Sequence, residues 1–170
     1  QRPELQAAWV MPPVAGRHEG VALVDFASLY PNIILSANLC YTTLVDSPGE
    51  NILTIKVPPK YDDKTGNPIP GTGGTFHWKQ DEIGLLPSVV KDMLDLRKKY
   101  KSLMREADDA DTKLGYNMLQ MAVKVAVNAI YGMTGSKVIA GQWSNYPIAQ
   151  CITYLGRESI TMLTEKSAER

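Results

Sequence analysis

The segment from Val21 to Ala37 constrains the fold of this chain more than any other. It reads V-A-L-V-D-F-A-S-L-Y-P-N-I-I-L-S-A, and a short apolar run, Val21–Val24, stands directly before Asp25. Such a run favours a strand buried on both faces. Pro31 favours the first turn of a helix, where its missing N–H costs nothing. The segment therefore predicts a strand, a tight corner and a helix in succession.

Asp25 places a charge beside an apolar run, which is costly unless a partner compensates it. In the corner that follows, Ala27–Tyr30, backbone N–H groups lack strand or helix partners and can point at an anion. A hard divalent cation suits the carboxylate, because magnesium selects carboxylate, carbonyl, water and phosphate oxygens. A helix N-cap or turn aspartate is the alternative interpretation. The segment by itself leaves both open.

Length and composition predict a globular protein. A chain of 170 residues with 44% hydrophobic residues can form one domain or two small lobes. No apolar run approaches the ~20 residues that span a bilayer, and no signal peptide is visible, so we expect an intracellular protein without a membrane partner. Cys40 and Cys151 have no metal-ligand spacing and are predicted to be reduced core thiols.

Charge is balanced overall, with 18 basic and 18 acidic residues. This balance alone does not indicate a nucleic-acid-binding protein, because whole domains that bind DNA are usually basic. The distribution is more informative, since five basic residues fall within positions 97–105 and acidic residues follow at once.

Two kinds of element are predicted along the rest of the chain. Residues 41–45, 52–57 and 75–78 are strand-prone, and the Pro/Gly-rich tract between the last two predicts a long hairpin-like insertion. Apolar residues then recur at helical period from residue 84 to 104, and again from 114 to 132 after a polar break. This pair predicts an antiparallel helical hairpin. A last helical pattern covers residues 148–163.

The helical hairpin carries a second group of polar side chains. Arg97 and Lys101 share one helix face, as do Lys124, Asn128 and Tyr131 on the next helix. If the hairpin turns near residue 110, positions 97 and 123 lie opposite each other, because both helices rise ~1.5 Å per residue. Cations gathered in this way need an anion, and a polyphosphate is the one we expect. A solvated helix face is the alternative for the first two. An unpaired ammonium in the apolar stretch around Lys124 would be costly.

These stretches resemble motifs of the family B DNA polymerases. D-F-A-S-L-Y-P-N-I-I resembles motif A, D-x-x-S-L-Y-P-S-I-I, with Asn32 in place of Ser. Lys124–Gly132 resembles motif B, K-x-x-x-N-S-x-Y-G, with Ala129 in place of Ser. Arg97 and Lys101 resemble the R-x-x-x-K of the fingers helix, and Y-L-G-R-E near the end is similar to the palm helix after motif B.

The resemblance implies an α+β fold. Part of a palm subdomain, an antiparallel β-sheet with helices, would be interrupted by a helical-hairpin fingers subdomain. The implied boundaries are 1–48 for the first palm part with motif A, 49–80 for the Pro/Gly-rich β insertion, 81–132 for the fingers with motif B, and 133–170 for the second palm part.

The resemblance also implies the palm and fingers portion of a DNA-directed DNA polymerase. Such an enzyme adds deoxynucleotides to a primer 3′-OH by two-metal nucleotidyl transfer, in which one metal activates the attacking oxygen and the other stabilises the leaving group. Asp25 would be catalytic and would bind two Mg²⁺ ions, and the backbone carbonyl of Phe26 would bind one of them. The residues implied to bind the deoxynucleoside triphosphate (dNTP) are Ser28, Leu29, Tyr30, Arg97, Lys101, Lys124, Asn128 and Tyr131. Among them Tyr30 would exclude a ribose 2′-OH.

The D-T-D core of the family's motif C does not occur in this sequence. We therefore expect the second metal-binding carboxylate to come from outside the chain, and the chain to be inactive alone. The implied partners are primer–template DNA, dNTPs and the remaining polymerase segments, namely the motif C palm, the thumb and a proofreading exonuclease. The location would be the cytoplasm in a prokaryote or the nucleus in a eukaryote. A non-catalytic nucleotide-binding or assembly subunit derived from a polymerase is the alternative function.

Overall fold

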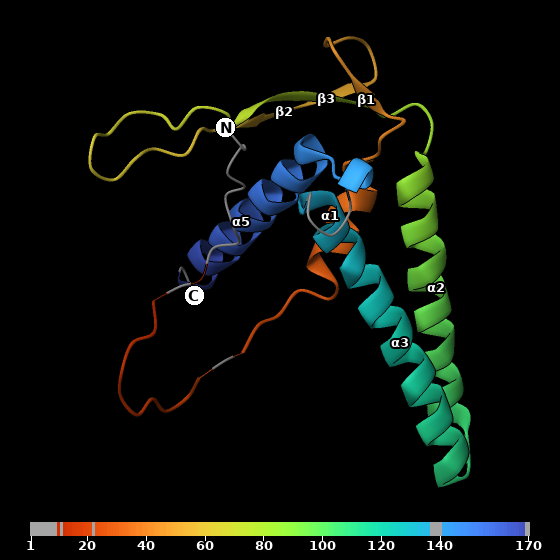
Figure 1. Cartoon of the computed structure of the whole chain (residues 1–170). Coiled ribbons are helices and arrows are strands. Elements are labelled where there is room, and N and C mark those ends of the chain that lie inside the picture. Colours follow the sequence, from red (N-terminus) through yellow and green to blue (C-terminus); the bar gives the residue numbers. More distant parts are fainter. Residues whose placement is uncertain (1–9, 11, 22, 137–140, 169–170) are drawn as a thin grey trace.

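The computed structural model describes residues 10, 12–21, 23–136 and 141–168. Its elements in chain order are α1 (Leu29–Ser36), β1 (Leu44–Val45), β2 (Ile52–Val57), β3 (Gly74–Lys79), α2 (Leu85–Glu106), α3 (Ala110–Gly135), the 3₁₀ turn η1 (Gly141–Trp143) and α5 (Tyr146–Ala168). A three-stranded sheet and four α-helices make up the described part of the chain (Figure 1), which confirms the α+β class. None of these helices is long and apolar enough to cross a membrane.

The sheet is antiparallel with strand order β1-β3-β2. β2 and β3 pair from Ile52 opposite Lys79 to Val57 opposite Gly74, which confirms the predicted hairpin-like arrangement. β1 contains only the last two residues of the predicted run 41–45, because the chain turns before it. This turn is closed by the hydroxyl of Thr43, which donates to the carbonyl of Asn38 at 2.6 Å.

The hydrophobic core lies between one face of the sheet and the helices α1 and α5. Trp78 of the central strand is fully buried there, in one cluster with Ile34 of α1 and Ile152 of α5. Cys40 and Cys151 are buried free thiols in the same region, as predicted. The core therefore fixes α1 between the sheet and α5.

Helices α2 and α3 form the predicted antiparallel hairpin, which projects away from the core (Figure 1). The break between them is shorter than predicted and contains only residues 107–109. Asp109 starts α3 early because its carboxylate caps the helix, accepting a hydrogen bond from the backbone N–H of Thr112 at 2.8 Å. α3 also continues beyond the predicted end at Gly132, as far as Gly135.

The strand predicted for Val21–Val24 is absent, and this prediction was wrong for the structure described here. Val21, Leu23 and Val24 are 73%, 93% and 58% exposed and have no strand conformation; residue 22 lies outside the described residues. A strand exists only with a hydrogen-bonded neighbour. The three described strands pair only with one another, and none lies beside this segment. The apolar run therefore precedes α1 as an irregular, exposed segment.

The C-terminal end of α1 is tied to the start of α2 by one buried side chain. Asn38 adopts a left-handed conformation with φ 50° directly after the helix. Its amide nitrogen donates to the carbonyls of Lys79 and Glu82, both at 2.7 Å, and its amide oxygen accepts from the N–H of Gly84 at 2.8 Å. This network sets the position of the helical hairpin relative to α1.

Candidate functional site

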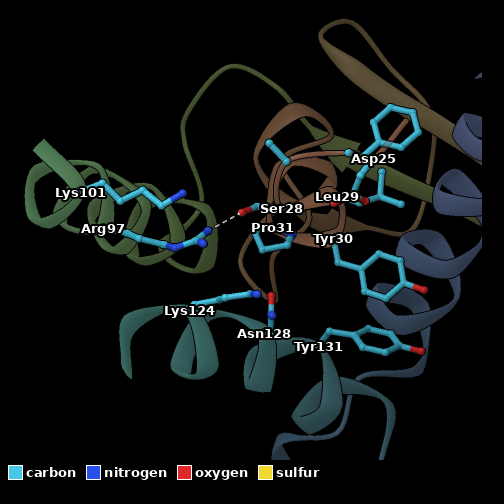
Figure 2. Close-up of a pocket in the computed structure, with 12 residues that line it drawn as sticks. Asp25, Ser28, Leu29, Tyr30, Pro31, Arg97, Lys101, Lys124, Asn128 and Tyr131 are labelled. Carbon is cyan, nitrogen blue, oxygen red and sulfur yellow. Dashed lines mark hydrogen bonds between the residues drawn. The ribbon is translucent and has the colours of Figure 1, made fainter. Parts of the chain in front are cut away.

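A cavity of about 670 Å³ lies between the N-terminal end of α1 and the helical hairpin. Its lining comes from the corner before α1, from α1 itself and from one face each of α2 and α3 (Figure 2). The lining residues are Asp25, Phe26, Ala27, Ser28, Leu29, Tyr30, Pro31, Arg97, Lys101, Lys124, Asn128 and Tyr131. Every residue predicted for the site is among them, so the structure brings together two groups that lie about 70 to 100 positions apart in sequence.

The corner before α1 and the first turn of the helix line this cavity. Ser28 has a left-handed conformation, φ 57°, and its side chain does not cap the helix. The N–H groups of the first helical turn have no intrahelical acceptor, and the first intrahelical bond runs from the N–H of Asn32 to the carbonyl of Ser28 at 3.0 Å. The side chain of Asn32 also donates to the carbonyl of Ala27 at 2.7 Å, which braces the corner. The positive end of α1 therefore faces the cavity.

Arg97 links the corner to the hairpin. Its Nη1 donates to the hydroxyl of Ser28 at 3.2 Å (Figure 2), and its Nε donates to Oε1 of Gln120 at 3.3 Å. Gln120 is buried and donates in turn to the side chain of Asn117 at 2.9 Å. The guanidinium is thus held between the corner before α1 and α3, in the wall of the cavity.

The register of the hairpin differs from the prediction by about one helical turn. Arg97 lies beside Gln120 rather than opposite position 123, and the rings of Tyr100 and Tyr116 stack with centroids 6.4 Å apart. The cause is the early start of α3 at Ala110, which moves the centre of the turn toward residue 108. Lys124 still lies in the cavity wall, because it projects from α3 one turn nearer to α1.

The cavity is electropositive. Three cations line it, Arg97, Lys101 and Lys124, against a single carboxylate, Asp25. Within the described part of the chain none of the three forms an ion pair with an acidic side chain. Cations from two helices and the N-terminal end of a third therefore face one space, which is an arrangement that attracts a polyanion.

Two tyrosine rings close the cavity on the side of α5. Tyr30 and Tyr131 lie with ring centroids 4.7 Å apart and an interplanar angle of 53°. Burial raises the pKa of both phenols, and the nearby guanidinium of Arg157 partly offsets this. Both rings are therefore neutral at physiological pH and form an apolar surface at the base of the cavity (Figure 2).

The residues of the cavity fit only part of a metal site. The described residues contain no group of three or more His, Cys, Asp or Glu side chains that could hold an ion. Asp25 and Phe26 line the cavity, and a carboxylate and a backbone carbonyl are hard oxygen donors of the kind magnesium selects. A cation bound there would need further ligands from a substrate, water or another segment.

Three further residues support the site and were missed in the sequence. Gln120 orients Arg97, Asn32 braces the corner, and Gly156 of α5 lies against the ring of Tyr30. Gln120 had a detectable signal, because a polar residue on an apolar helix face needs a partner. Gly156 lies in the Y-L-G-R-E stretch that resembles a palm helix, but this resemblance does not indicate its contact with Tyr30, which joins segments more than 120 residues apart.

Comparison with known proteins identifies the family of this chain. The sequence model of DNA polymerase family B matches residues 1–170. The chain therefore belongs to DNA polymerase family B, which confirms the family expected from its motifs.

Among curated relatives, the DNA polymerase delta catalytic subunit of Caenorhabditis elegans is 38% identical over 168 residues, covering 97% of this chain and 14% of that protein. The corresponding subunit of Arabidopsis thaliana is 36% identical over 149 residues, covering 88% of this chain and 13% of that protein. The chain thus spans about one seventh of the length of these relatives.

A solved structure shares the fold. The family B DNA polymerase from the hyperthermophilic archaeon Pyrobaculum calidifontis aligns with a TM-score of 0.64 and 23% identity, over 85% of this chain and 17% of that one. The fold of this chain is thus similar to part of a polymerase of the same family.

Proposed function

We propose that this chain is the palm and fingers portion of a DNA-directed DNA polymerase and that its cavity binds the incoming dNTP. The observation that carries the proposal is the meeting of Arg97, Lys101 and Lys124 with the open N-terminal end of α1 in one cavity. A triphosphate is a compact polyanion whose oxygens suit guanidinium, ammonium and backbone N–H donors. Membership of DNA polymerase family B supports the same assignment.

Each side of the cavity would contribute its own contacts to the phosphates. Arg97, already aimed at Ser28, would contact phosphate oxygens with its free N–H groups, and Lys101 and Lys124 would act as point charges. Backbone N–H groups at Ser28 and Leu29 would bind the phosphates nearest α1. Asn128, one helical turn beyond Lys124, would add an amide donor.

The tyrosines would contact the nucleoside. Tyr30 would lie beneath the sugar and exclude a ribose 2′-OH, and Tyr131 would pack near the nascent base pair. Their contact at 4.7 Å between centroids supports these roles, because each ring limits the movement of the other. A rigid apolar surface can discriminate against an added hydroxyl that finds no partner.

The reaction would be nucleotidyl transfer. The primer 3′-oxygen forms a bond to the α-phosphorus of the dNTP, the bond from that phosphorus to the bridging oxygen breaks, and pyrophosphate leaves while the 3′-OH proton passes to solvent or a base. Two Mg²⁺ ions, when bound, would stabilise charge on the reacting oxygens. From this chain Asp25 and the carbonyl of Phe26 would hold them, and the second carboxylate would come from another polymerase segment. We therefore propose that the chain is inactive alone.

The proposed organisation places the first palm part in residues 1–48, a β insertion in 49–80, the fingers in 81–132 and the second palm part in 133–170. Primer–template DNA and the segments carrying motif C, the thumb and the exonuclease would be its partners. An intracellular location, nuclear in a eukaryote, follows from a DNA substrate.

Nucleotide binding tests the cavity with matched lysines. Lys124→Ala should weaken binding of Mg²⁺-dATP to the chain by about ten- to a hundredfold, because it removes a charge-assisted contact. Lys113→Ala, an exposed lysine on the same helix outside the cavity, should leave binding unchanged. On α2, Lys101→Ala is the second test variant and should weaken binding, and Lys99→Ala, outside the cavity, is its control and should not. Isothermal titration calorimetry measures each, and equal effects within a pair would refute the assignment.

Primer extension tests the catalytic proposal. The chain alone should not extend a primer, and supplying the remaining polymerase segments should restore synthesis. In that assembly Asp25→Ala should abolish synthesis but leave DNA binding intact. Asp92→Ala, on the exposed side of α2, should leave both synthesis and DNA binding intact. Robust synthesis by the isolated chain would contradict the proposal that another segment supplies the second metal-binding carboxylate. Nucleotide binding that is never followed by synthesis would favour a non-catalytic subunit instead.

A further inference from the structure

Helix α5 packs against the ring of Tyr30, on the side of α5 that carries a glycine, Gly156. Gly156 is buried in the middle of this 23-residue helix. A Cβ atom built on it would lie 2.9 Å from Cε1 and 3.6 Å from Cδ1 of Tyr30, and 3.7 Å from Cδ1 of Ile33. The ring of Tyr30 therefore occupies the space that any other side chain at position 156 would need.

This close approach explains why position 156 is occupied by glycine. A glycine inside a helix is unfavourable by roughly 0.5–1 kcal/mol relative to alanine, so its presence needs a compensating contact. Carbon atoms in good contact lie about 3.5–4.0 Å apart, so a separation of 2.9 Å would force one group to move.

The ring of Tyr30 has few directions in which to move. Tyr131 lies against it with centroids 4.7 Å apart, and Ile33 on the same helix is 6% exposed and part of the core. α5 itself is fixed by Ile148 and Ile152, which are both fully buried. The cavity, which Tyr30 lines and Gly156 does not, provides open space beside the ring.

We propose that Gly156 is a positioning residue that sets how far Tyr30 extends into the cavity, and thereby the fit of the nucleotide sugar. The sugar part of this inference rests on the proposed function. The positioning part does not, since it concerns only the contact between α5 and α1. A methyl group at position 156 would push the Tyr30 ring into the cavity and reduce the space beneath the sugar.

The positioning part is tested without a nucleotide. The full chain is labelled with 3-fluorotyrosine, and the ¹⁹F resonance of Tyr30 is assigned as the one missing in Tyr30→Phe. Gly156→Ala should shift this resonance and that of Tyr131. Gly115→Ala should shift neither, because a Cβ there meets nothing within 4 Å. An unchanged Tyr30 resonance in a folded Gly156→Ala chain would overturn the proposal.

A double variant keeps the test decisive if Gly156→Ala alone does not fold. Tyr30→Ala removes the ring that the new methyl group meets, so Gly156→Ala/Tyr30→Ala should fold, and it should unfold at the same denaturant concentration as Tyr30→Ala or at a slightly higher one, because alanine is the better helix former. Failure of the double variant to fold would mean that position 156 acts through another neighbour, and would overturn the proposal.

The sugar part is tested by calorimetry with Mg²⁺-dATP and Mg²⁺-ATP. Gly156→Ala should weaken dATP binding about tenfold and ATP binding by more, which is the scale of an overpacked contact. In the Tyr30→Ala background the same change should have no effect on either nucleotide. An equal loss in both backgrounds would refute an action through Tyr30. Absence of dATP binding by the unaltered chain would instead refute the proposed function, and the fluorine measurement would still decide the role of Gly156.

Discussion

The two ends of helix α1 are both flanked by a non-glycine residue in the left-handed conformation, yet the two residues have opposite surroundings. Asn38 follows the helix with φ 50° and Ser28 precedes it with φ 57°. Asn38 is buried and makes three side-chain hydrogen bonds to other segments, whereas Ser28 caps nothing and is partly exposed in the cavity. The same unusual backbone geometry thus closes one end of the helix and opens the other.

The closed end satisfies its own backbone. The N–H of Leu39 bonds back to the carbonyl of Ile34 at 3.0 Å, and that of Asn38 to Leu35 at 3.3 Å, which is the pattern of a helix that terminates in a left-handed residue. At the open end the first-turn N–H groups keep no acceptor within the helix. The C-terminal end of α1 is thus tied into the fold, and its N-terminal end is where we propose that the ligand binds.

The largest expected effect comes from breaking the closed end. Asn38→Ala should lower the free energy of unfolding by about 3–5 kcal/mol, because the buried N–H of Gly84 and the part-buried carbonyls of Lys79 and Glu82 lose a hydrogen bond and alanine tolerates φ 50° poorly. Urea denaturation measures this. Asn38→Gly removes the same bonds without the conformational penalty, so it should be about 1 kcal/mol less destabilising. A loss below about 1 kcal/mol for both variants would contradict the role of this network.

The next largest effect concerns the backbone that Asn38 binds. A Cβ on Gly84 would lie 2.5 Å from Cβ of Cys40 and 2.9 Å from Cγ2 of Thr43. Gly84→Ala should therefore cost about 2–3 kcal/mol of stability by overpacking. Gly115→Ala, in open space on α3, should instead stabilise the chain by up to about 1 kcal/mol, because alanine is the better helix former. Equal effects of the two substitutions in thermal unfolding would show that the closed end is not tightly packed.

The contrast between the ends also explains what could be predicted from sequence. The residues predicted for the cavity were predictable because each belongs to a motif with fixed spacing, D-x-x-S-L-Y-P, R-x-x-x-K or K-x-x-x-N-x-x-Y, and the local helix geometry follows from that spacing. The closed end was not predicted. Its main signal, an asparagine just after a helical turn, is common to many helix ends.

The remaining differences arise from interactions across space. The strand expected at Val21–Val24 depends on a neighbouring strand, and composition does not reveal whether one is present. The hairpin register was displaced by one turn because Asp109 acts as an N-cap within a segment whose acidic composition suggested a longer loop. Gly156 could not be recognised without knowing which ring faces it.

A smaller effect on the free energy of unfolding is expected from Cys151, which is buried in the core beside α1, and this effect depends on pH. Burial raises the pKa of the Cys151 thiol from 9.0 to about 12. The folded state therefore keeps a proton that the unfolded chain releases, so stability is fully present below pH 9 and is lost progressively as pH rises toward 12. The loss is at most about 1.4 kcal/mol per pH unit for one group. Denaturation at pH 8 and pH 10 should show a steeper decline for the unaltered chain than for Cys151→Ala, and identical slopes would contradict this account.

The smallest effect on stability is expected at the open end itself. Ser28→Gly relieves the left-handed strain but makes the unfolded chain more flexible, so the free energy of unfolding should change by less than about 0.5 kcal/mol. Because the hydroxyl that accepts from Arg97 at 3.2 Å is lost, dATP binding should weaken about threefold. Ser28→Ala keeps the strain and loses the same hydroxyl, so it should match the binding loss and be about 1 kcal/mol less stable than Ser28→Gly. A destabilisation by Ser28→Gly as large as that of Asn38→Ala would mean that both ends of α1 are structural, and the division between a closed and an open end would be wrong.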